Sequence, residues 1–518
     1  MATWTYIIES PRLASLAAIL YVLALHRFTV VIYRLYFSPI ANFPGPKLAA
    51  VTSLYEFYFN FVKNGKYVFE VERLHKRYGP IVRVNPHELS VSDADFYDKL
   101  YVSGSVRSTE NYNHFVEGID FQGSHFLTTP HDLHRARRKP LEPYFSRLGI
   151  MQFESNIIEL VENFLKRFNK LEGSGTVIRL DHAMLCFTGD VISRVCCDDP
   201  TYLLDDENFS ANWYESLHTI IKSMPLLEGF PWIIRLVRYI PESILLWADP
   251  RSQLFNDWRT MAENHILKAK NERGSGKERP SVSNGKRSTL LRHLVNSDLP
   301  ESELSVPRLV NEAQVLLGAG TVGTARVLDL TCYYILANPD IRAKMGKELA
   351  EVMDNYPKTK PSWTQLERLP FFQAVIKEGL RMSFGVMRRL PRVSPTQAIN
   401  YREWIIPAGV PVGMSSYMQH TDPLVFPCPL EFRPERWLPG NVTPLMNRNF
   451  VPFSKGSRNC LGINLAYAEM NHILAALFCG DGLKFALFET DVSDVTLAHD
   501  FVVPLPRVDS KGIRVKFE

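Results

Sequence analysis

The segment Phe453-Ser454-Lys455-Gly456-Ser457-Arg458-Asn459-Cys460-Leu461-Gly462 decides the fold. Gly456 and Gly462 flank the cysteine, and they permit backbone angles that let this loop approach a flat ligand closely. A helical pattern begins directly after Cys460, so a helix N-terminus would point at the sulfur and lower the pKa of the thiol. Arg458 is placed to pair with a carboxylate. These features together predict a thiolate that binds iron.

The spacing F-x-x-G-x-R-x-C-x-G matches at five fixed positions and resembles the haem-ligand signature of the cytochrome P-450 superfamily. Most cysteines are buried and inert, but a chance match at five positions is rare. The resemblance implies a mostly helical α+β domain with small β-sheets that encloses one haem b. It implies that Cys460 ligates the iron, and that Phe453, Gly456, Arg458 and Gly462 contact the haem.

Two further segments resemble elements of this family. Glu378-Gly379-Leu380-Arg381 has the form E-x-x-R, which places its two charges on one face of a helix. Such pairs are usually solvated, but Phe432-Arg433-Pro434-Glu435-Arg436-Trp437 resembles a second element of the same family. The resemblance implies that Glu378, Arg381 and Arg436 form a buried charge network beneath the haem-ligand loop. Removal of one partner there would leave a buried charge unpaired.

A basic segment, HDLHRARRKPLEPYF at 131–145, resembles the W-x-x-x-R helix of the family, with His134 where tryptophan is common. The resemblance implies that His134 and Arg138 face a haem propionate, and that Arg392, in RRLPRV, is another propionate partner. The basic cluster is also compatible with a surface for an acidic redox partner. We expect it to be divided between the two roles; its members are Arg135, Arg137, Arg138 and Lys139.

The longest predicted helix spans 305–337 and is about 48 Å long at 1.5 Å per residue. Ser305 can cap it, Pro307 suits its first turn, and Asn338-Pro339 ends it. Small residues occupy its middle, and each glycine costs roughly 1 kcal/mol of helix propensity. Either another element packs closely there, or a flat ligand needs the room. The resemblance implies that Ala319 and Gly320 contact the haem.

This helix departs from the family pattern A/G-G-x-D/E-T-T/S. It reads Ala319-Gly320-Thr321-Val322-Gly323-Thr324, so Val322 replaces the acid and Gly323 replaces the alcohol. Neither side chain can donate or accept a proton. In one interpretation water, Thr321, Thr324 or a substrate hydroxyl relays protons, and the enzyme is a monooxygenase.

In the alternative interpretation the haem catalyses an isomerisation, dehydration or rearrangement without dioxygen activation. We favour the monooxygenase because ordinary members of the family greatly outnumber the others. A haem carrier without enzymatic activity is a more distant possibility. Loops that contain Phe115, Phe121 and Phe126 indicate a substrate cavity, although these side chains are equally compatible with core positions.

The amino end predicts a retained membrane anchor. Residues 13–25 carry no charge, and apolar sequence resumes after Arg27, which together gives about the length needed to cross a bilayer. A cleaved signal peptide would need a small-residue site, which is missing, and a core helix fits poorly before a proline-rich segment. Arg27, Arg34 and Lys47 follow the apolar run and only Arg12 precedes it, so the rest of the chain should face the cytosol.

We therefore predict an anchor over 1–37, a proline-rich linker over 38–46 and a catalytic domain over 47–518, held by one span in the endoplasmic reticulum membrane. Within the domain, 81–92 should form a hairpin, 399–406 and 501–517 should contain strands, and the polar stretch 271–288 should be a flexible surface loop.

The composition is that of a globular protein, with 518 residues of which 46% are apolar and 22% are charged. A net charge of +4 is too small to indicate nucleic-acid binding. Seven scattered cysteines indicate a reducing compartment. Since no dinucleotide fingerprint lies in a strand-turn-helix context, NADPH electrons should arrive through a separate flavoprotein reductase. FPGPKLAA and NEAQVLLGAGT resemble fungal microsomal members, so the expected substrate is an apolar secondary metabolite such as a terpenoid or polyketide.

Overall fold

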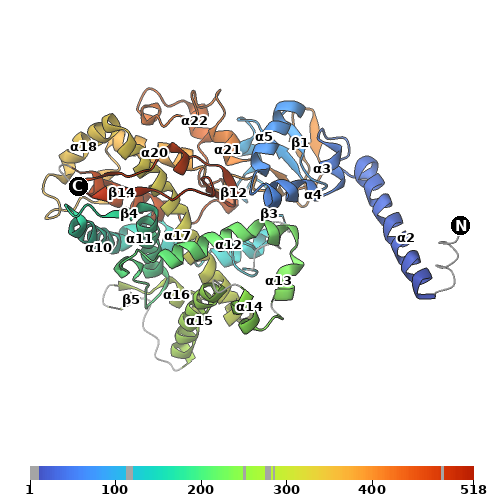
Figure 1. Cartoon of the computed structure of the whole chain (residues 1–518), viewed down its shortest axis with the longest axis horizontal. Helices are drawn as coiled ribbons and strands as arrows, with labels where there is room; N and C mark the ends of the chain where they lie inside the picture. The colour runs from blue at the N-terminus through green and yellow to red at the C-terminus, as the bar shows by residue number, and fades with distance from the viewer. Residues whose placement is uncertain are drawn as a thin grey trace.

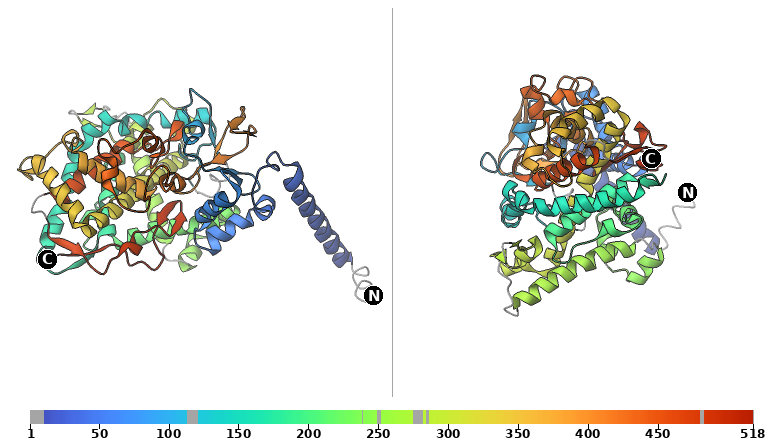
Figure 2. Two further views of the ribbon diagram at one scale, coloured as in Figure 1. Left: turned by 90° about the horizontal axis from the view of Figure 1, so that it is seen from above. Right: turned by 90° about the vertical axis from the view of Figure 1, so that its left-hand side faces the viewer.

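A computed structural model describes residues 11–112, 121–237, 239–248, 252–274, 282–283, 286–479 and 483–517. Long helices make up the body of the molecule, and short strands form small sheets at its margins (Figure 1). The side and end views in Figure 2 show the helices stacked in layers. The fold class is thus the helical one, with small sheets, that the sequence predicted.

One long helix, α17 (Val306–Ala337), crosses the interior. Its first turn contains Pro307 as predicted, and it ends at Asn338, where α18 (Pro339–Met353) begins. Ser305 occupies the N-cap position, but its side chain makes no capping hydrogen bond, contrary to the prediction. The helix is stabilised by packing instead, because most of its residues are buried against neighbouring helices.

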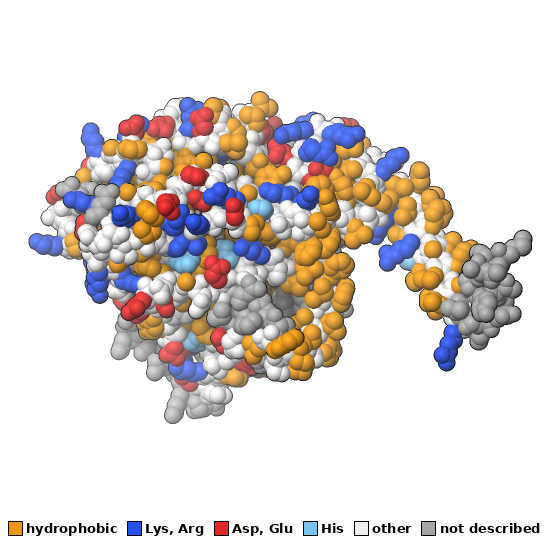
Figure 3. Space-filling view, viewed as in Figure 1, with side chains coloured by type: hydrophobic (Ala, Val, Ile, Leu, Met, Phe, Trp, Pro, Cys, Tyr) orange, Lys and Arg blue, Asp and Glu red, His pale blue; other side chains and the backbone are white. Residues whose placement is uncertain are grey.

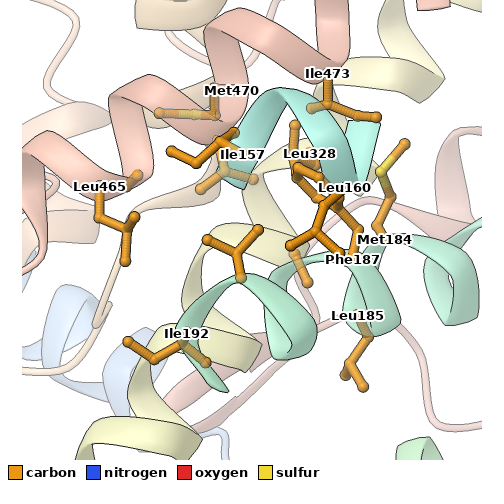
Figure 4. Packing of buried hydrophobic residues seen from close by; sticks show 14 of the residues in the cluster. Ile157, Leu160, Met184, Leu185, Phe187, Ile192, Leu328, Leu465, Met470 and Ile473 are labelled. Atoms are coloured by element: carbon orange, nitrogen blue, oxygen red, sulfur yellow. The ribbon is translucent and has the colours of Figure 1, made fainter. Parts of the chain in front are cut away.

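The core lies where α10 (Arg147–Leu171), α11 (Leu180–Cys196) and α23 (Ile463–Phe478) pack around α17. Every residue of α11 other than Arg194 is buried, as expected for a helix enclosed on all sides. Ile157 and Leu160 of α10 pack toward Leu328 and Ile473 in this cluster (Figure 4). The cluster holds α17 and α23, the two helices that border the predicted haem site, in fixed positions.

The predicted hairpin at 81–92 is confirmed as two antiparallel strands in which Ile81 pairs with Val91. Its second strand joins a five-stranded sheet in the order β1-β2-β10-β7-β3. Residues 399–406 form two strands joined in a hairpin rather than one strand. The bounds are β1 (Ile81–Arg83), β2 (Leu89–Val91), β3 (Glu110–Asn111), β7 (Arg392–Val393), β8 (Ile399–Tyr401), β9 (Trp404–Ile406) and β10 (Val412–Gly413).

The predicted carboxyl-terminal strand region, 501–517, contains the end of β12 (His499–Phe501) and all of β13 (Val503–Leu505) and β14 (Arg514–Phe517). The last strand, β14, lies between β11 (Phe485–Leu487) and β4 (Val177–Arg179) in a three-stranded sheet. The predicted surface loop at 271–288 begins later than expected, because α15 (Ser252–Gly274) continues into it. Residues 275–281 and 284–285 of that loop lie outside the described residues.

The amino-terminal helix α2 (Pro11–Ile32) projects from the body and continues as a π-helical turn, Tyr33–Phe37 (Figure 1). The segment Ala14–Phe37 has 24 residues, a mean hydropathy of 1.9 and no buried part, so it is a candidate membrane span. The α17 helix is also long and apolar enough, but it is mostly buried in the core. Exposure therefore distinguishes α2 from α17 as the candidate anchor.

The proline-rich linker is fixed against the domain rather than loose. Arg83 of β1 donates its backbone N–H to the carbonyl of Pro44 at 2.7 Å. Phe43 stacks on Trp404 with ring centroids 4.8 Å apart. Gly45 adopts φ of +158° beside the Arg83 carbonyl, where a Cβ atom would overlap. These contacts set the angle at which the chain leaves the anchor.

A second exposed apolar surface lies on the body, on the side from which α2 leaves (Figure 3). It combines residues around α4 (Leu54–Phe57) with residues in and around α13 (Trp232–Val237) and α14 (Glu242–Ala248). An apolar area of this extent is typical of an interaction site. We call it the apolar patch; it consists of Leu48, Leu54, Tyr58, Phe61, Val62, Trp232, Leu236, Val237, Tyr239, Ile244 and Trp247.

Close packing of α20 (Pro370–Ser383) on α17 generates a stability prediction. A Cβ atom on Gly379 would overlap with the hydroxyl of the buried Thr331 on α17. Gly379→Ala should therefore lower the free energy of unfolding by about 1–3 kcal/mol. Gly346→Ala in α18 is the matched control, since its Cβ would meet only the Phe478 carbonyl at 3.7 Å. The control should be neutral or stabilising by up to about 1 kcal/mol; urea unfolding that ranks the two variants equally would contradict the packing argument.

Candidate functional site

The loop that carries Cys460 closes on itself just before α23. The backbone N–H of Cys460 donates to the Phe453 carbonyl at 2.9 Å, and Ser457 donates to the Val102 carbonyl at 3.1 Å. Gly456 has φ of +77°, and a Cβ atom there would overlap with the Val102 carbonyl. Only glycine fits both requirements. The loop is thereby held in one shape with its cysteine at the tip.

The sulfur of Cys460 faces open space. Its side chain is exposed, whereas Cys186, Cys196, Cys197 and Cys332 are buried. Burial of the surrounding loop nevertheless raises the pKa of Cys460, and the Gly462 amide and the nearby Arg138 only partly oppose this. The amide at the helix N-terminus thus lowers the pKa of the thiol as expected, but desolvation outweighs it, so the net shift is upward in the protein alone. A bound metal cation would reverse that balance.

The middle of α17 also borders open space. Ala319 and Gly323 are exposed although the helix around them is largely buried, and they share one face because they are four residues apart. A Cβ atom on Gly323 would have no atom within 4 Å. Gly318 and Gly320 differ: their Cβ atoms would lie 3.0 Å from Trp258 and 2.5 Å from Ile192. Some of these small residues thus allow close packing of neighbouring helices, and others leave space for a ligand. Gly320, which was expected to contact the haem, faces Ile192 of α11 instead.

Three buried or half-buried arginines gather beside the Cys460 loop. Arg458 donates to the carbonyls of Thr128 and Thr129 at 2.6 Å each. Arg392 donates to the Asn111 side chain at 3.0 Å, and Arg138 donates to the Asn459 carbonyl at 2.7 Å. These partners are neutral oxygens, so the cluster carries positive charge that they do not balance.

The pKa shifts of this cluster reflect the excess of positive charge. Burial, followed by Arg392 and opposed by Glu110, lowers the pKa of Arg458 to about 9. Burial and Arg458 lower the pKa of His134 to about 2, so its ring is neutral. His134 is buried, and its Nδ1 has no hydrogen-bond partner among the described residues. The three arginines together with His134 are therefore well suited to bind an anionic ligand with two carboxylates.

The basic helix α8 (His131–Arg138) divides its charges between the interior and the surface. Arg137 forms an ion pair with Glu303 at 2.6 Å. Arg138 turns inward to Asn459 and also approaches Glu142 at 3.3 Å. Arg135 and Lys139 are exposed. The cluster is thus split between inner and outer positions, and its expected division between propionate binding and a redox-partner surface stays a prediction.

A buried charge network lies beneath the Cys460 loop. Glu378 and Arg381 are fully buried, and their side chains pair with an N–O distance of 2.8 Å. Arg436 contacts the same carboxylate at 3.0 Å. Trp437, which the sequence reasoning missed, donates its indole N–H to Glu378 at 2.8 Å. This tryptophan is part of the P-E-R-W motif, so its membership of the network could have been predicted from the sequence.

His420 connects this network to the haem-ligand loop and was also missed. Arg381 donates to the His420 carbonyl at 2.9 Å, and His420 Nδ1 lies 2.9 Å from the Arg381 carbonyl. Burial lowers the pKa of His420 to about 3, so the ring is neutral and Nε2 accepts the Val451 N–H at 2.9 Å. Val451 directly precedes the loop. No local sequence pattern marks His420, since its partners lie far away along the chain.

A second missed cluster holds the segment before α8 against α17. Glu312 is fully buried, and its carboxylate accepts hydrogen bonds from the His125 backbone at 3.0 Å and from Arg308 at 2.8 Å. The three predicted aromatic residues near this segment have separate outcomes. Phe121 packs on Trp258, Phe126 is 42% exposed, and Phe115 lies outside the described residues.

The two predicted relay threonines differ in their surroundings. Thr321 is buried against α11, and its hydroxyl donates to the Leu317 carbonyl at 2.7 Å. Its backbone carbonyl accepts a hydrogen bond from Thr188 of α11 at 2.8 Å. Thr324 is half-buried and follows Gly323, which faces the open space. The Thr321 hydroxyl is thus directed at the backbone of its own helix, whereas Thr324 lies next to the exposed Gly323; the relay role of both threonines stays a prediction.

These residues fit an iron porphyrin. A cysteine sulfur facing open space supplies an iron ligand, and the face of Ala319 and Gly323 leaves room for a flat macrocycle. Arg138 also pairs with Glu142, whereas Arg392 and Arg458 have hydrogen bonds to neutral oxygens, so the three arginines together leave an excess of positive charge that suits two propionates. Within the described residues, no cluster of three or more His, Cys, Asp or Glu side chains could hold a metal by itself.

The sequence model of the family described as cytochrome P450 matches residues 50–479. The chain is 54% identical to cytochrome P450 monooxygenase oblB of Aspergillus clavatus, over 95% of each chain. It is 50% identical to fusicoccadiene C-8 hydroxylase of Phomopsis amygdali, over 94% of this chain and 93% of that one. It is 41% identical to stellatic acid synthase of Emericella variicolor, over 95% of this chain and 93% of that one.

The charge network generates a second prediction. Glu378→Gln leaves Arg381 and Arg436 buried without their counter-ion, so it should lower the free energy of unfolding by about 3–5 kcal/mol. The matched control is Glu435→Gln, whose partner Lys344 lies 2.9 Å away on the surface. Loss of that exposed pair should cost less than about 1 kcal/mol. Thermal unfolding would show a much larger fall in Tm for the first variant; similar Tm values would mean that the buried network does not stabilise the fold.

Proposed function

Because the chain belongs to the cytochrome P450 family of monooxygenases, we propose that it inserts one oxygen atom of dioxygen into an apolar terpenoid. The observation that carries this proposal is the position of Cys460, whose sulfur faces open space in a loop that only a glycine-bearing sequence can form. The relatives with known names support the choice of reaction. The family implies a haem cofactor and a reductase that donates electrons.

The proposed cofactor is haem b with Cys460 as the iron ligand. When bound, haem supplies the iron at which dioxygen is activated, and a thiolate ligand favours cleavage of the O–O bond. Arg138, Arg392, Arg458 and His134 would bind the propionates, with the arginines keeping the carboxylates ionised. Phe453 would support the ligand loop through its carbonyl, which already accepts the Cys460 N–H.

The proposed substrate is a terpenoid hydrocarbon such as fusicoccadiene, on which a 50% identical relative acts according to its name. A cleft lies beside the apolar patch. Leu54, Phe57 and Phe230 line its apolar part, whereas other parts of its lining carry the charged residues Glu228, Arg388 and Asp500. Phe57 and Phe230 meet edge to face with centroids 5.0 Å apart. The name of this relative, rather than the cleft, supports a terpenoid over a polyketide.

Electrons are proposed to come from NADPH through a flavoprotein reductase. Arg135 and Lys139 are exposed on α8, close to the Cys460 loop because Arg138 of the same helix binds Asn459. Exposed basic side chains attract an acidic partner surface and speed its association. The side of α8 that carries these residues is therefore the proposed docking site.

The proposed location is the endoplasmic reticulum membrane, with residues 1–37 as a single-pass anchor, 38–46 as the linker and 47–518 as a catalytic domain facing the cytosol. Exposure of α2 and its apolar composition support the anchor. Basic residues after the apolar run support the orientation. The apolar patch would rest on the same membrane surface.

A reaction without dioxygen activation is the second candidate, because Val322 and Gly323 leave no acid or alcohol at the usual positions of α17. An isomerisation, dehydration or rearrangement would not need them. Such a reaction would consume neither NADPH nor dioxygen, which separates it from monooxygenation in one experiment.

That experiment incubates the purified enzyme with reductase, NADPH, ¹⁸O₂ and fusicoccadiene. We expect a product that carries one labelled oxygen atom, and no product when NADPH or dioxygen is omitted. Turnover in their absence would support the second candidate instead. A Cys460→Ser variant should lose the thiolate-type absorption band of the reduced, carbon-monoxide-bound form. A variant that kept this band would refute the proposed iron ligand.

The apolar patch generates a membrane-binding prediction. A chain without residues 1–37 should still sediment with phospholipid vesicles, because the patch remains. Tyr239→Glu together with Trp247→Glu should abolish this binding, since both side chains are 86% exposed. Leu424→Glu is the control, an equally exposed apolar residue that does not belong to the patch. Equal loss of binding in the control would show that the patch has no special role.

A further inference from the structure

The cleft beside the apolar patch joins segments that are far apart in the sequence. It has a volume of about 110 Å³, and it is lined by residues of α4, of α5 (Tyr67–Tyr78), of the end of α12 (Ala211–Gly229) and of the segment 388–391. Its apolar wall is closely packed, because a Cβ atom on Gly229 would overlap with the ring of Phe57, which also contacts Phe230. The rest of the lining is polar, so the cleft has an apolar part and a polar part.

Carboxylates outnumber cationic groups in the polar part. Arg388 forms ion pairs with Glu228 at 2.6 Å and with Asp500 at 3.3 Å. Arg389 likewise contacts two carboxylates, at 2.6 Å and 2.9 Å. Each arginine balances one of its two partners, so an excess of negative charge remains, which disfavours a ligand with a carboxylate. The charged lining consists of Glu56, Glu88, Glu228, Asp500, Arg388 and Arg389.

One buried acceptor and one buried donor in the polar part have no partner. Asn60 is 8% exposed, and its side-chain Oδ1 has no hydrogen-bond partner among the described residues. Arg388 directs Nε and Nη1 at its two carboxylates, whereas its buried Nη2 has no partner in the part of the chain that the structure describes. Both side chains line the cleft. Buried polar atoms usually have partners, so these two atoms indicate a ligand that donates to Asn60 and accepts from Arg388.

A hydroxyl group meets both requirements. It donates one hydrogen bond and accepts others, so a single hydroxyl group can pair with Asn60 Oδ1 and with Arg388 Nη2. Water has the same capacity, but only an alcohol with an apolar tail also covers Phe57 and Phe230. A hydrocarbon would cover these rings and leave both polar atoms unpaired. The lining therefore fits a neutral alcohol with an apolar body.

Asp500 holds the two polar groups in place. Gly65 donates its backbone N–H to the Asn60 carbonyl at 2.7 Å, and its own carbonyl accepts the Asp500 N–H at 2.8 Å. The Asp500 carboxylate in turn accepts a hydrogen bond from Arg388 Nε at 3.3 Å. Gly65 has φ of +71°, and a Cβ atom there would overlap with the Asp500 backbone. One chain of hydrogen bonds thus links Asn60 to Arg388.

The cleft borders parts of the protein that an alcohol product would meet on leaving. Leu54, in its apolar part, belongs to the apolar patch that is proposed to rest on the membrane (Figure 3). Arg388, in its polar part, lies four residues before Arg392 of the arginine cluster, so their Cα atoms are no more than about 14 Å apart. The proposed monooxygenation replaces a C–H bond of a hydrocarbon by a C–OH group. A hydroxyl group is therefore what distinguishes its product from its substrate.

We propose that this cleft binds the hydroxyl group of the terpenoid alcohol that the enzyme produces. Asn60 accepts the hydrogen bond of the hydroxyl group, Arg388 donates to its oxygen, and the hydrocarbon part lies against Phe57 and Phe230. The cleft thereby retains the alcohol on the membrane side of the domain and discriminates against the hydrocarbon. This inference rests on the proposed function for the source of the alcohol, whereas recognition of a hydroxyl group rests on the cleft alone.

Recognition of a hydroxyl group can be measured by calorimetry on the haem-loaded, full-length protein. Three probes share a similar ten-carbon skeleton: geraniol carries a hydroxyl group, geranic acid carries a carboxylate, and myrcene is a hydrocarbon. Geraniol should bind about tenfold more tightly than myrcene, because one hydroxyl group satisfies two buried atoms. Geranic acid should bind no more tightly than myrcene, because the cleft has an excess of negative charge. Equal affinity for geraniol and myrcene, or a preference for geranic acid, would overturn the proposal.

Two variants test the residues that recognise the hydroxyl group. Asn60→Leu and Arg388→Lys should each weaken geraniol binding about fivefold to tenfold and leave myrcene binding unchanged. The matched control is Asn156→Leu, a half-buried asparagine of α10 outside the cleft, which should bind all three probes as the wild type does. If Asn60→Leu does not fold, Arg388→Lys carries the test, since lysine keeps the positive charge beside Glu228. Unchanged geraniol affinity in the folded variants would contradict the assignment.

Cross-linking locates the bound alcohol and identifies its source. A geraniol analogue with a diazirine on its tail should label residues 53–71 and 225–230, and labelling confined to the face of Ala319 and Gly323 would place the alcohol elsewhere. Labelling that cholesterol in phosphatidylcholine vesicles suppresses, and excess geraniol does not, would assign the cleft to a membrane sterol and overturn the proposal. If the enzyme forms no ¹⁸O-labelled alcohol, the proposed function fails together with the source of the ligand. Calorimetry would still decide whether the cleft recognises a hydroxyl group.

Discussion

The structure depends on one buried negative charge, the carboxylate of Glu378. Arg381, Arg436 and the indole of Trp437 all donate to it, and all belong to segments that meet beneath the haem-ligand loop. A buried charge is strongly destabilising when a partner is missing, so the network links the stability of these segments to one another. Through His420 the same network reaches Val451, at the start of the loop. The position of Cys460 thus depends on the charge network around Glu378, which reaches the haem-ligand loop through His420.

The small residues of α17 allow close packing on two sides and leave one face open, and both features lower the stability of the helix itself. Gly318 and Gly320 let Trp258 and Ile192 approach on two sides of the helix, while Ala319 and Gly323 leave the face between them open. The glycines lower the helix propensity of this segment, and burial of the rest of the helix in the core offsets that loss of stability. The usual acid and alcohol positions of α17 are occupied by Val322 and Gly323. The small side chains at the centre of this helix therefore leave room for a ligand, but these two positions supply no proton donor.

Much of the fold was predictable because its signals are local. The hairpin at 81–92, the bounds of α17 and the exposed α2 follow from alternation, breakers and apolar length, which act between near neighbours. Other details were not predictable. The Ser305 side-chain cap is absent because packing already stabilises the helix, and α15 runs into the expected loop. The thiol pKa moves upward because the desolvation of Cys460 depends on the whole surrounding fold.

The sequence by itself determined the family, the candidate iron ligand and the residues of the charge network, because these lie in motifs with fixed spacing. Only the tertiary structure decided which side chains serve packing and which face the open space. It placed the Thr321 hydroxyl in a helix contact, and it added His420 and Trp437 to the network. The physical reason is that burial and the direction of a side chain arise from contacts between segments far apart in the chain, which no local pattern records.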